Sequence, residues 1–153
     1  MNRRSVTFAA LAALVAGTLL MAPAKAETGF SLSLVSDVNP VAAGSFPSYL
    51  TNFNGSLYFQ SNDGTGAELW KSNGTTSTKV VDLNSDSSGS RPSSLTVLNS
   101  KLYFIAQLDD GKWLYSLSTS DVATKIAKVS TDNVTSGFEI HAGDNYLFVT
   151  IAG

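Results

Sequence analysis

The chain has 153 residues, with ten basic and twelve acidic side chains, a single histidine and no cysteine. The absence of cysteine excludes disulfides, thiolate metal sites and cysteine nucleophiles, and with only one histidine it argues against a transition-metal site. The charges are scattered singly, without a basic patch or an arginine-rich run, which argues against nucleic-acid binding and against attraction to an anionic membrane surface.

Residues 1–26 have the composition of a signal peptide. Two arginines near the N-terminus precede an apolar stretch over residues 6–21, and Ala24-Lys25-Ala26 has the form of a cleavage site. The apolar stretch is short for a membrane span, which needs about 20 residues, so a retained anchor is the less favoured alternative. We expect a mature chain of residues 27–153, without a membrane span, in the periplasm or outside the cell.

The remainder of the chain has the pattern of short β-strands and no helical periodicity. Apolar runs rich in Val, Leu, Tyr and Phe are separated by turns of Asn, Asp, Gly, Ser and Thr. Asn54-Gly55 suits a two-residue hairpin turn because both residues tolerate positive φ. In chain order, the expected strands are Phe30–Val38, Ser48–Phe53, Ser56–Ser61, Ala67–Ser72, Thr78–Leu83, Ser93–Leu98, Lys101–Gln107, Lys112–Leu117, Val122–Val129, Phe138–His141 and Tyr146–Ile151.

These strands belong to a repeat with a period of 45 residues. Val35–Asn39 returns as Val80–Asn84, and Asn54–Phe59 returns as Asn99–Phe104 and, more faintly, as Asp144–Val149. A period of this length with strand-like content is typical of propellers with four-stranded blades. We predict an all-β fold, a propeller-like array of four-stranded antiparallel blades, with two complete blades of about 45 residues and partial flanking blades. The repeat domain covers residues 27–153, with units near residues 35–79 and 80–124 and a partial unit at 125–153.

One segment resembles a known family. Glu68–Thr75, which reads ELWKSNGT, is similar to the signature of the bacterial ELWxxDGT repeat, a secreted tandem repeat also described as hyalin-like. The segment departs from the signature at Asn73, and the second copy, Trp113–Thr119, keeps little of it beyond Leu114. The resemblance extends over residues 35–117. It implies a β-propeller-like fold and export, and it implies no established enzymatic activity.

The strands supply fewer than three blades, whereas a propeller closes with about four to eight. This chain alone therefore does not close the array. Three interpretations stay open. The chain is a truncated or decayed copy of a longer repeat protein, or it assembles with itself through open blade edges, or it stands alone as an open array of sheets.

Calcium binding is the most specific chemistry that the loops suggest, because oxygen ligands from Asp, Asn and backbone carbonyls suit this ion. The candidates are Asp63, Asp109 and Asp110, and the repeated segments Asp37–Asn39 and Asp82–Asn84 have similar composition. The alternative is that these side chains cap their own turns. Repetition at one blade position favours this structural alternative, and we predict no catalytic residue and no other cofactor.

His141 is the only histidine and lies in an apolar strand, so we interpret it as a structural or surface residue. An enzyme would need acids and bases gathered at one rim of the array. The test that the sequence suggests is whether Asp63, Asp82, Asp109, Asp110 and His141 come together in the structure. Their convergence would favour an enzyme or a metal site.

The aromatic residues allow two interpretations, as core or as platforms for stacking sugars. Tyr58 and Phe59 are adjacent in one strand, so they lie on opposite faces. We expect Phe59, Phe104 and Leu57 in the core between blades, and we expect more solvent contact for Tyr58 and Trp70.

The function expected from these observations is an exported, non-enzymatic binding or cell-surface interaction module, with a protein or a glycan as its partner. Two alternatives remain. One is a fragment of a propeller-based enzyme, such as a hydrolase or a lyase, and the other is a purely structural remnant. The open blade edges also make a homo-oligomer a candidate assembly.

Overall fold

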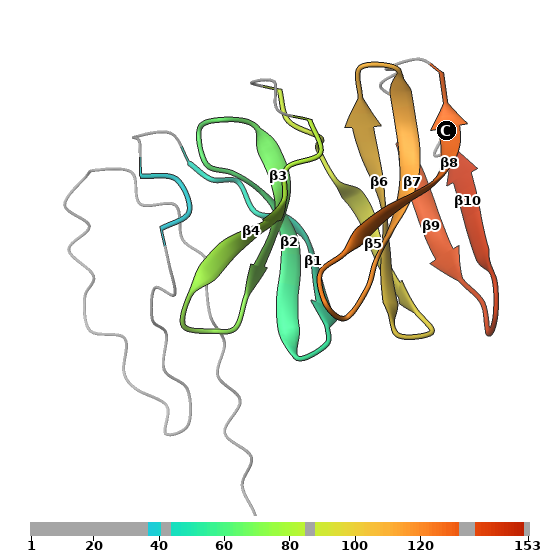
Figure 1. Cartoon of the computed structure of the whole chain (residues 1–153), viewed down its shortest axis with the longest axis horizontal. Helices are drawn as coiled ribbons and strands as arrows, with labels where there is room; N and C mark the ends of the chain where they lie inside the picture. Colours follow the sequence, from blue (N-terminus) through green and yellow to red (C-terminus); the bar gives the residue numbers. More distant parts are fainter. Residues whose placement is uncertain (1–36, 41–43, 85–87, 132–136, 152–153) are drawn as a thin grey trace, which may run out of the picture.

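The computed structural model describes residues 37–40, 44–84, 88–131 and 137–151 (Figure 1). The strands are β1 (Ser48–Phe53), β2 (Ser56–Asn62), β3 (Ala67–Ser72), β4 (Ser77–Val81), β5 (Ser93–Leu98), β6 (Lys101–Leu108), β7 (Gly111–Leu117), β8 (Ala123–Ser130), β9 (Phe138–Ala142) and β10 (Leu147–Ile151). Within these ranges every regular element is a strand, which confirms the all-β prediction. The same ranges contain no helix long and apolar enough to cross a bilayer. The expected signal peptide lies outside the described residues, as does most of the expected strand Phe30–Val38, whose last two residues are not in a strand.

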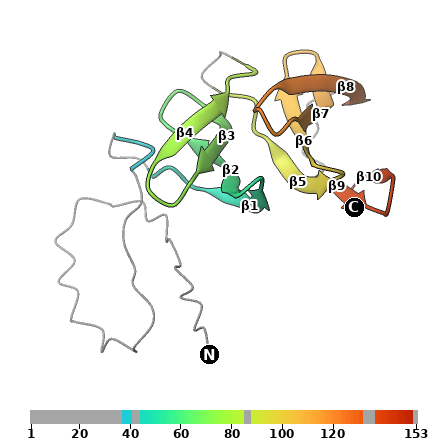
Figure 2. The same cartoon turned by 60° about the horizontal axis from the view of Figure 1, so that its bottom comes forward.

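The strands form three antiparallel sheets, which we call the first, second and third sheet. The first has the order β1-β2-β3-β4, the second β5-β6-β7-β8, and the third consists of β9 and β10. Within each sheet, the strands that are adjacent in sequence pair with each other, and none of the described sheets closes on itself. The sheets follow one another in a row, with the third sheet at one end, in both views of Figures 1 and 2. The predicted four-stranded units are thereby confirmed.

The sequence repeat is also a repeat of backbone conformation. Phe46, Tyr49 and Asn54 have φ values of 45°, 56° and 49°, and the residues 45 positions later have 45°, 54° and 48°. Register irregularities fall between Ser48 and Thr51 and again at the corresponding place in β5. The Asn54-Gly55 turn has positive φ at both residues, as the hairpin prediction requires. Most expected strands match within one residue at each end, whereas β4 ends at Val81 rather than Leu83.

Two apolar clusters fill the spaces between the sheets. The first cluster joins the first and second sheets and consists of Phe53, Tyr58, Leu69, Leu102, Phe104, Ala106, Tyr115 and Leu117. The second cluster joins the second and third sheets and consists of Ile105, Leu114, Phe138 and Ile140. Because side chains alternate along a strand, the second sheet uses both faces for packing, one against each neighbouring sheet.

The aromatic predictions are confirmed in part. Phe59 and Phe104 are buried as expected, while Leu57 is only half-buried. The expectation of solvent contact at Tyr58 is wrong, since this side chain is 2 % exposed and belongs to the first cluster. The face of β2 that carries Tyr58 is covered by the second sheet, which alternation within one strand could not indicate. Trp70 is half-buried.

Neighbouring sheets meet through their first strands in a way that repeats. Thr51 Oγ1 on β1 donates to the carbonyl oxygen of Leu95 on β5 at 3.3 Å. Thr96 Oγ1 on β5 donates to the carbonyl oxygen of Ile140 on β9 at 3.0 Å. Donors and acceptors are both displaced by 45 residues between the two bonds. We call this arrangement the sheet joint: a first strand whose side chain donates to the first strand of the next sheet.

Candidate functional site

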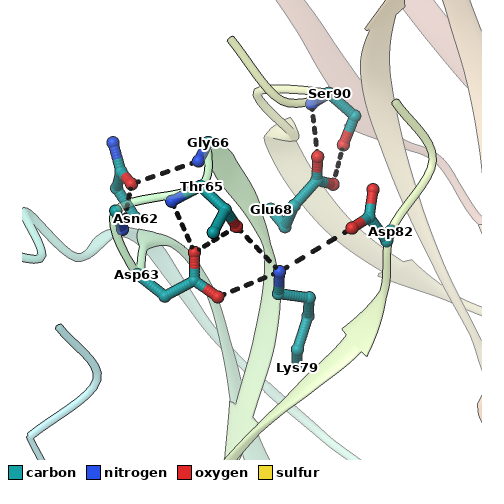
Figure 3. Close-up of polar contacts among 9 residues, drawn as sticks. Asn62, Asp63, Thr65, Gly66, Glu68, Lys79, Asp82 and Ser90 are labelled. Atoms are coloured by element: carbon teal, nitrogen blue, oxygen red, sulfur yellow. Dashed lines mark hydrogen bonds and ion pairs between the residues drawn. The ribbon is translucent and has the colours of Figure 1, made fainter. Parts of the chain in front are cut away.

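The calcium candidate Asp63 lies in the loop between β2 and β3 (Figure 3). Its Oδ1 accepts bonds from the backbone N–H of Thr65 at 3.0 Å and from the Thr65 hydroxyl at 2.6 Å. Its Oδ2 lies 2.9 Å from Lys79 Nζ on β4. In the same loop, Asn62 Oδ1 accepts from the N–H of Gly64 at 2.8 Å. Both side chains cap their own turn, which is the structural alternative considered above.

Lys79 is the cation at this loop. Its ammonium group also lies 3.8 Å from Asp82 Oδ2 and 3.3 Å from the Thr65 hydroxyl (Figure 3). Burial alone would raise the pKa of Asp63, but the bonds from Thr65 and Lys79 outweigh it and lower the pKa to about 2. Burial would likewise lower the pKa of Lys79, but the pKa is raised because Asp63 and Asp82 stabilise its charge. A calcium ion at Asp63 would therefore have to replace a bound ammonium group.

Glu68 on β3 is a buried carboxylate beside this loop (Figure 3). Its Oε1 accepts from the backbone N–H of Ser90 at 2.7 Å, and its Oε2 accepts from the Ser90 hydroxyl. The N–H of Arg91 donates to the carbonyl oxygen of Ala67 at 2.9 Å in the same contact. Burial raises the pKa of Glu68, and the two bonds from Ser90 offset only part of that rise. Glu68 therefore fixes the segment that leads into β5. The sequence pattern did not predict this pairing with Ser90.

The candidates Asp109 and Asp110 lie in the β6–β7 turn, in a different sheet from Asp63. Asp110 Oδ1 accepts from Trp113 Nε1 at 2.8 Å, and Asp110 Oδ2 lies 3.0 Å from Lys128 Nζ. The bond from Trp113, followed by that from Lys128, lowers the pKa of Asp110. The ammonium group of Lys125 lies 3.7 Å from the centre of the Trp113 ring. This carboxylate, like Asp63, is bound by a lysine of its own sheet.

The five residues named as a test do not converge. Asp63 and Asp82 share Lys79 on the first sheet, and Asp110 pairs with Lys128 on the second. His141 is exposed on β9 of the third sheet, 3.3 Å from the carboxylate of Glu139. Across the described ranges, no group of three or more His, Asp or Glu side chains is placed to hold a metal ion.

The surface that does stand out is one face of the third sheet. In the register of this sheet Phe148 pairs with His141, and Thr150 pairs with Glu139. Phe138 and Ile140 pack on the second sheet. Because side chains alternate along a strand, the two pairs just named lie on the opposite face of the third sheet. The rings of Tyr146 and Phe148 meet edge to face at 5.3 Å. We call this surface the outward face; it consists of Glu139, His141, Tyr146, Phe148 and Thr150.

Phe148 occupies a position that is covered in both earlier repeats. Forty-five and ninety residues earlier in the chain lie Tyr103 and Tyr58. Tyr58 is 2 % exposed beneath the second sheet, and Tyr103 packs against the cluster shared with the third sheet. Phe148, in contrast, is 57 % exposed. The outward face thus has the aromatic residue of a sheet joint without a following sheet among the described residues.

His141 also aligns with joint residues, namely Thr51 and Thr96, whose hydroxyls donate to the next sheet. The sequence indicated a structural or surface role for His141, in keeping with its exposure, but it did not indicate the outward face. The signal that could have found it was the faint third copy of the repeat, aligned position by position with the two clear copies.

Comparisons with models of protein families, with curated proteins and with solved structures give no match for this chain. The candidate site therefore rests on its own geometry. That geometry contains a buried carboxylate that fixes the segment before β5, aspartates bound by lysines, and the exposed aromatic pair of the outward face.

Proposed function

We propose that this chain is an exported, non-enzymatic interaction module that binds a partner through the outward face of its third sheet. The observation that carries the proposal is the exposure of Phe148 at a position that a neighbouring sheet covers in both earlier repeats. An exposed aromatic pair on an otherwise ordinary sheet surface is typical of a binding site for a protein partner.

We also propose that the three sheets form a propeller-like array. Four-stranded antiparallel meanders, stacked face to face with their first strands adjacent, support this proposal. The repeated joint bonds of Thr51 and Thr96 support it further, because each new sheet is placed by the same contact as the one before. The resemblance of Glu68–Thr75 to ELWxxDGT repeats is in keeping with this architecture, and we propose membership of that family on those residues alone.

The use of the titratable groups supports a non-enzymatic role. Asp63, Asp110 and Asp121 each pair with a lysine, and Glu68 is bound by Ser90. General acid–base catalysis needs such groups within hydrogen-bonding reach of one substrate. Here they are distributed over separate sheets and are engaged in holding loops and turns.

The interaction proposal can be tested by photocrosslinking in the cells that make the protein. The photoreactive amino acid p-benzoylphenylalanine is placed at position 148 in one variant and at position 75 in a matched control, since Thr75 is exposed in the β3–β4 turn. We expect a protein adduct from position 148 and none from position 75. Equal adducts from both positions, or none from position 148, would contradict the proposal. Export is tested by the mass of the secreted chain, which should begin at Glu27.

A further inference from the structure

Two turns of the first sheet contain the same dipeptide, Asn-Gly. Asn54-Gly55 joins β1 to β2, and Asn73-Gly74 joins β3 to β4; both pairs are exposed. A Cβ atom added at either glycine would meet no atom within 4 Å, so both backbone nitrogens are equally open. A glycine nitrogen that is free of steric hindrance can attack the side-chain carbonyl carbon of the preceding asparagine, because glycine has no Cβ and adopts the required backbone conformations. The two turns therefore form a matched pair of potential deamidation sites.

The hydrogen bonds at Asn73 favour this attack. Its Oδ1 accepts from the backbone N–H groups of Thr75 and Thr76, both at 2.9 Å. Negative charge develops on this oxygen when the carbonyl carbon becomes tetrahedral, and backbone donors aimed at such an oxygen stabilise that state. The N–H of Gly74 donates to Ser72 Oγ at 3.2 Å, so the proton that the attacking nitrogen must lose already has an acceptor.

The hydrogen bond at Asn54 has the opposite effect. Its Nδ2 donates to the carbonyl oxygen of Thr119 at 3.0 Å, which holds the amide group that would have to leave. No hydrogen bond from another described residue reaches its Oδ1. The same dipeptide therefore has a stabilised carbonyl oxygen at position 73 and a restrained amide nitrogen at position 54.

We propose that Asn73 is a site of spontaneous covalent modification, at which the side-chain amide is converted into aspartate and isoaspartate. The inference goes beyond the binding proposed for the outward face and does not depend on it. The Gly74 nitrogen forms a bond to Cγ of Asn73 and loses its proton towards Ser72 Oγ and water. The bond from Cγ to the amide nitrogen breaks and ammonia leaves, which gives a cyclic succinimide. Water then opens this ring at either of its two carbonyl carbons, so the net reaction takes up one water, releases one ammonia and involves no oxidation or reduction.

The product adds a negative charge beside a lysine that holds two sheets together. Asn73 lines a cavity of about 170 Å³ with Ser56, Lys71, Thr76 and Thr78. Lys71 binds Asp121 of the second sheet, so a carboxylate at position 73 competes for its ammonium group. An aspartate at this position is also what the ELWxxDGT signature contains, in keeping with a turn that accommodates this product. Isoaspartate, in contrast, adds a methylene group to the main chain and disrupts the bonds to Thr75 and Thr76.

Peptide mapping by mass spectrometry tests the proposal on the native secreted chain, aged in neutral buffer. Trypsin cleaves after Lys71 and Lys79, so positions 54 and 73 fall in separate peptides. We expect conversion in the folded chain to be at least about tenfold faster at position 73 than at position 54, because only Asn73 has the backbone donors. In denaturing guanidinium chloride, where both turns are lost, we expect similar rates at the two positions. Isoaspartate at position 73, detected with an isoaspartyl methyltransferase, would show that the succinimide forms.

The Ser72→Ala variant tests the proton acceptor, and Ser56→Ala is its matched control, since Ser56 lines the same cavity without a bond from Gly74. We expect Ser72→Ala to slow conversion at position 73 severalfold and Ser56→Ala to leave it unchanged. The rate at position 54 reports in each variant whether the sheet is still folded. Equal rates at both positions in the folded native chain, or faster conversion at Asn54, would overturn the proposal. Aspartate without isoaspartate at position 73 would also overturn it, because water would then attack the amide directly.

Discussion

The hydroxyl of Tyr58 on β2 donates a 2.6 Å hydrogen bond to Asp121 in the β7–β8 turn, although 63 residues separate them. The same carboxylate accepts a bond from the ammonium group of Lys71 on β3. Burial alone would raise the pKa of Asp121, but the bonds from Lys71 and Tyr58 lower it. Asp121 therefore ties the first sheet to the second at the end opposite to Glu68 and Ser90.

Substitution of Asp121 or Tyr58 should measurably lower the free energy of unfolding. Asp121→Ala removes the partner of both Tyr58 and Lys71, and we expect a loss of about 1–3 kcal/mol in the free energy of unfolding. Tyr58→Phe keeps the ring in the first cluster and removes only the hydroxyl, so we expect about 0.5–1.5 kcal/mol. Urea denaturation measures both values. The double variant should lose less than the sum, and strict additivity would show that the two groups do not interact.

The pH dependence of stability should carry the signature of Asp63. Its pKa is about 2 in the folded chain, below the value of 3.8 for an unperturbed aspartate. A depressed folded-state pKa adds stability that is complete above the unfolded value and is lost as the pH falls from about 4 towards 2. We expect Asp63→Asn to remove about 1–2 kcal/mol of this dependence. Denaturation midpoints of both proteins between pH 2 and pH 6 decide the matter, and parallel curves would contradict the assignment.

Glu68 should show the opposite sign. Its folded-state pKa is raised by burial, so its contribution is most favourable at low pH and declines as the pH rises from the unfolded value through the folded one. Glu68→Gln keeps an acceptor for the Ser90 N–H without a charge, and we expect its stability at pH 7 to equal or exceed that of the native chain. Glu68→Ala leaves two buried Ser90 donors without acceptors and should cost about 2–4 kcal/mol. Chemical denaturation at pH 4 and pH 7 separates the two variants, and equal losses would refute this account.

Calcium should leave the stability of the chain unchanged. Asp63 and Asp110 already bind lysine ammonium groups, and binding of an ion would need to displace them. A ligand that binds only the folded state raises its thermal midpoint. We therefore expect the same midpoint with millimolar calcium and with a chelator. A calcium-dependent rise of several degrees that Asp63→Asn abolishes would show that the loop is a calcium site.

The parts of the fold that the sequence predicts are those set by local residues and by the period. The Asn54-Gly55 turn follows from the positive φ that both residues tolerate, and the alternation of Tyr58 and Phe59 follows from strand geometry. Because the sequence repeats every 45 residues, both features recur in the second sheet. The third sheet differs from the copy pattern, since β9 and β10 pair without the irregularity that interrupts β1 and β5.

The parts that the sequence did not predict depend on which segments meet across the sheets. Glu68 is paired with Ser90, 22 residues away, and Tyr58 with Asp121, and no local pattern indicates either partner. Exposure at Phe148 could not be read from its own strand, because Tyr58 and Tyr103 at the same position are covered. What distinguishes Phe148 is the absence of a following sheet among the described residues.

The most direct measurement is light scattering coupled to size exclusion on the purified secreted chain, over a range of concentrations, beside its Phe148→Ser variant. Phe148 is exposed within one chain, so this substitution should leave the circular dichroism spectrum unchanged and affect only contacts between chains. We predict that the native chain, as isolated from the cells that secrete it, elutes in a discrete assembly with its partner and that the variant elutes as a monomer with the same fold. A native chain that stays monomeric at every concentration, or an assembly that the substitution does not weaken, would contradict the account.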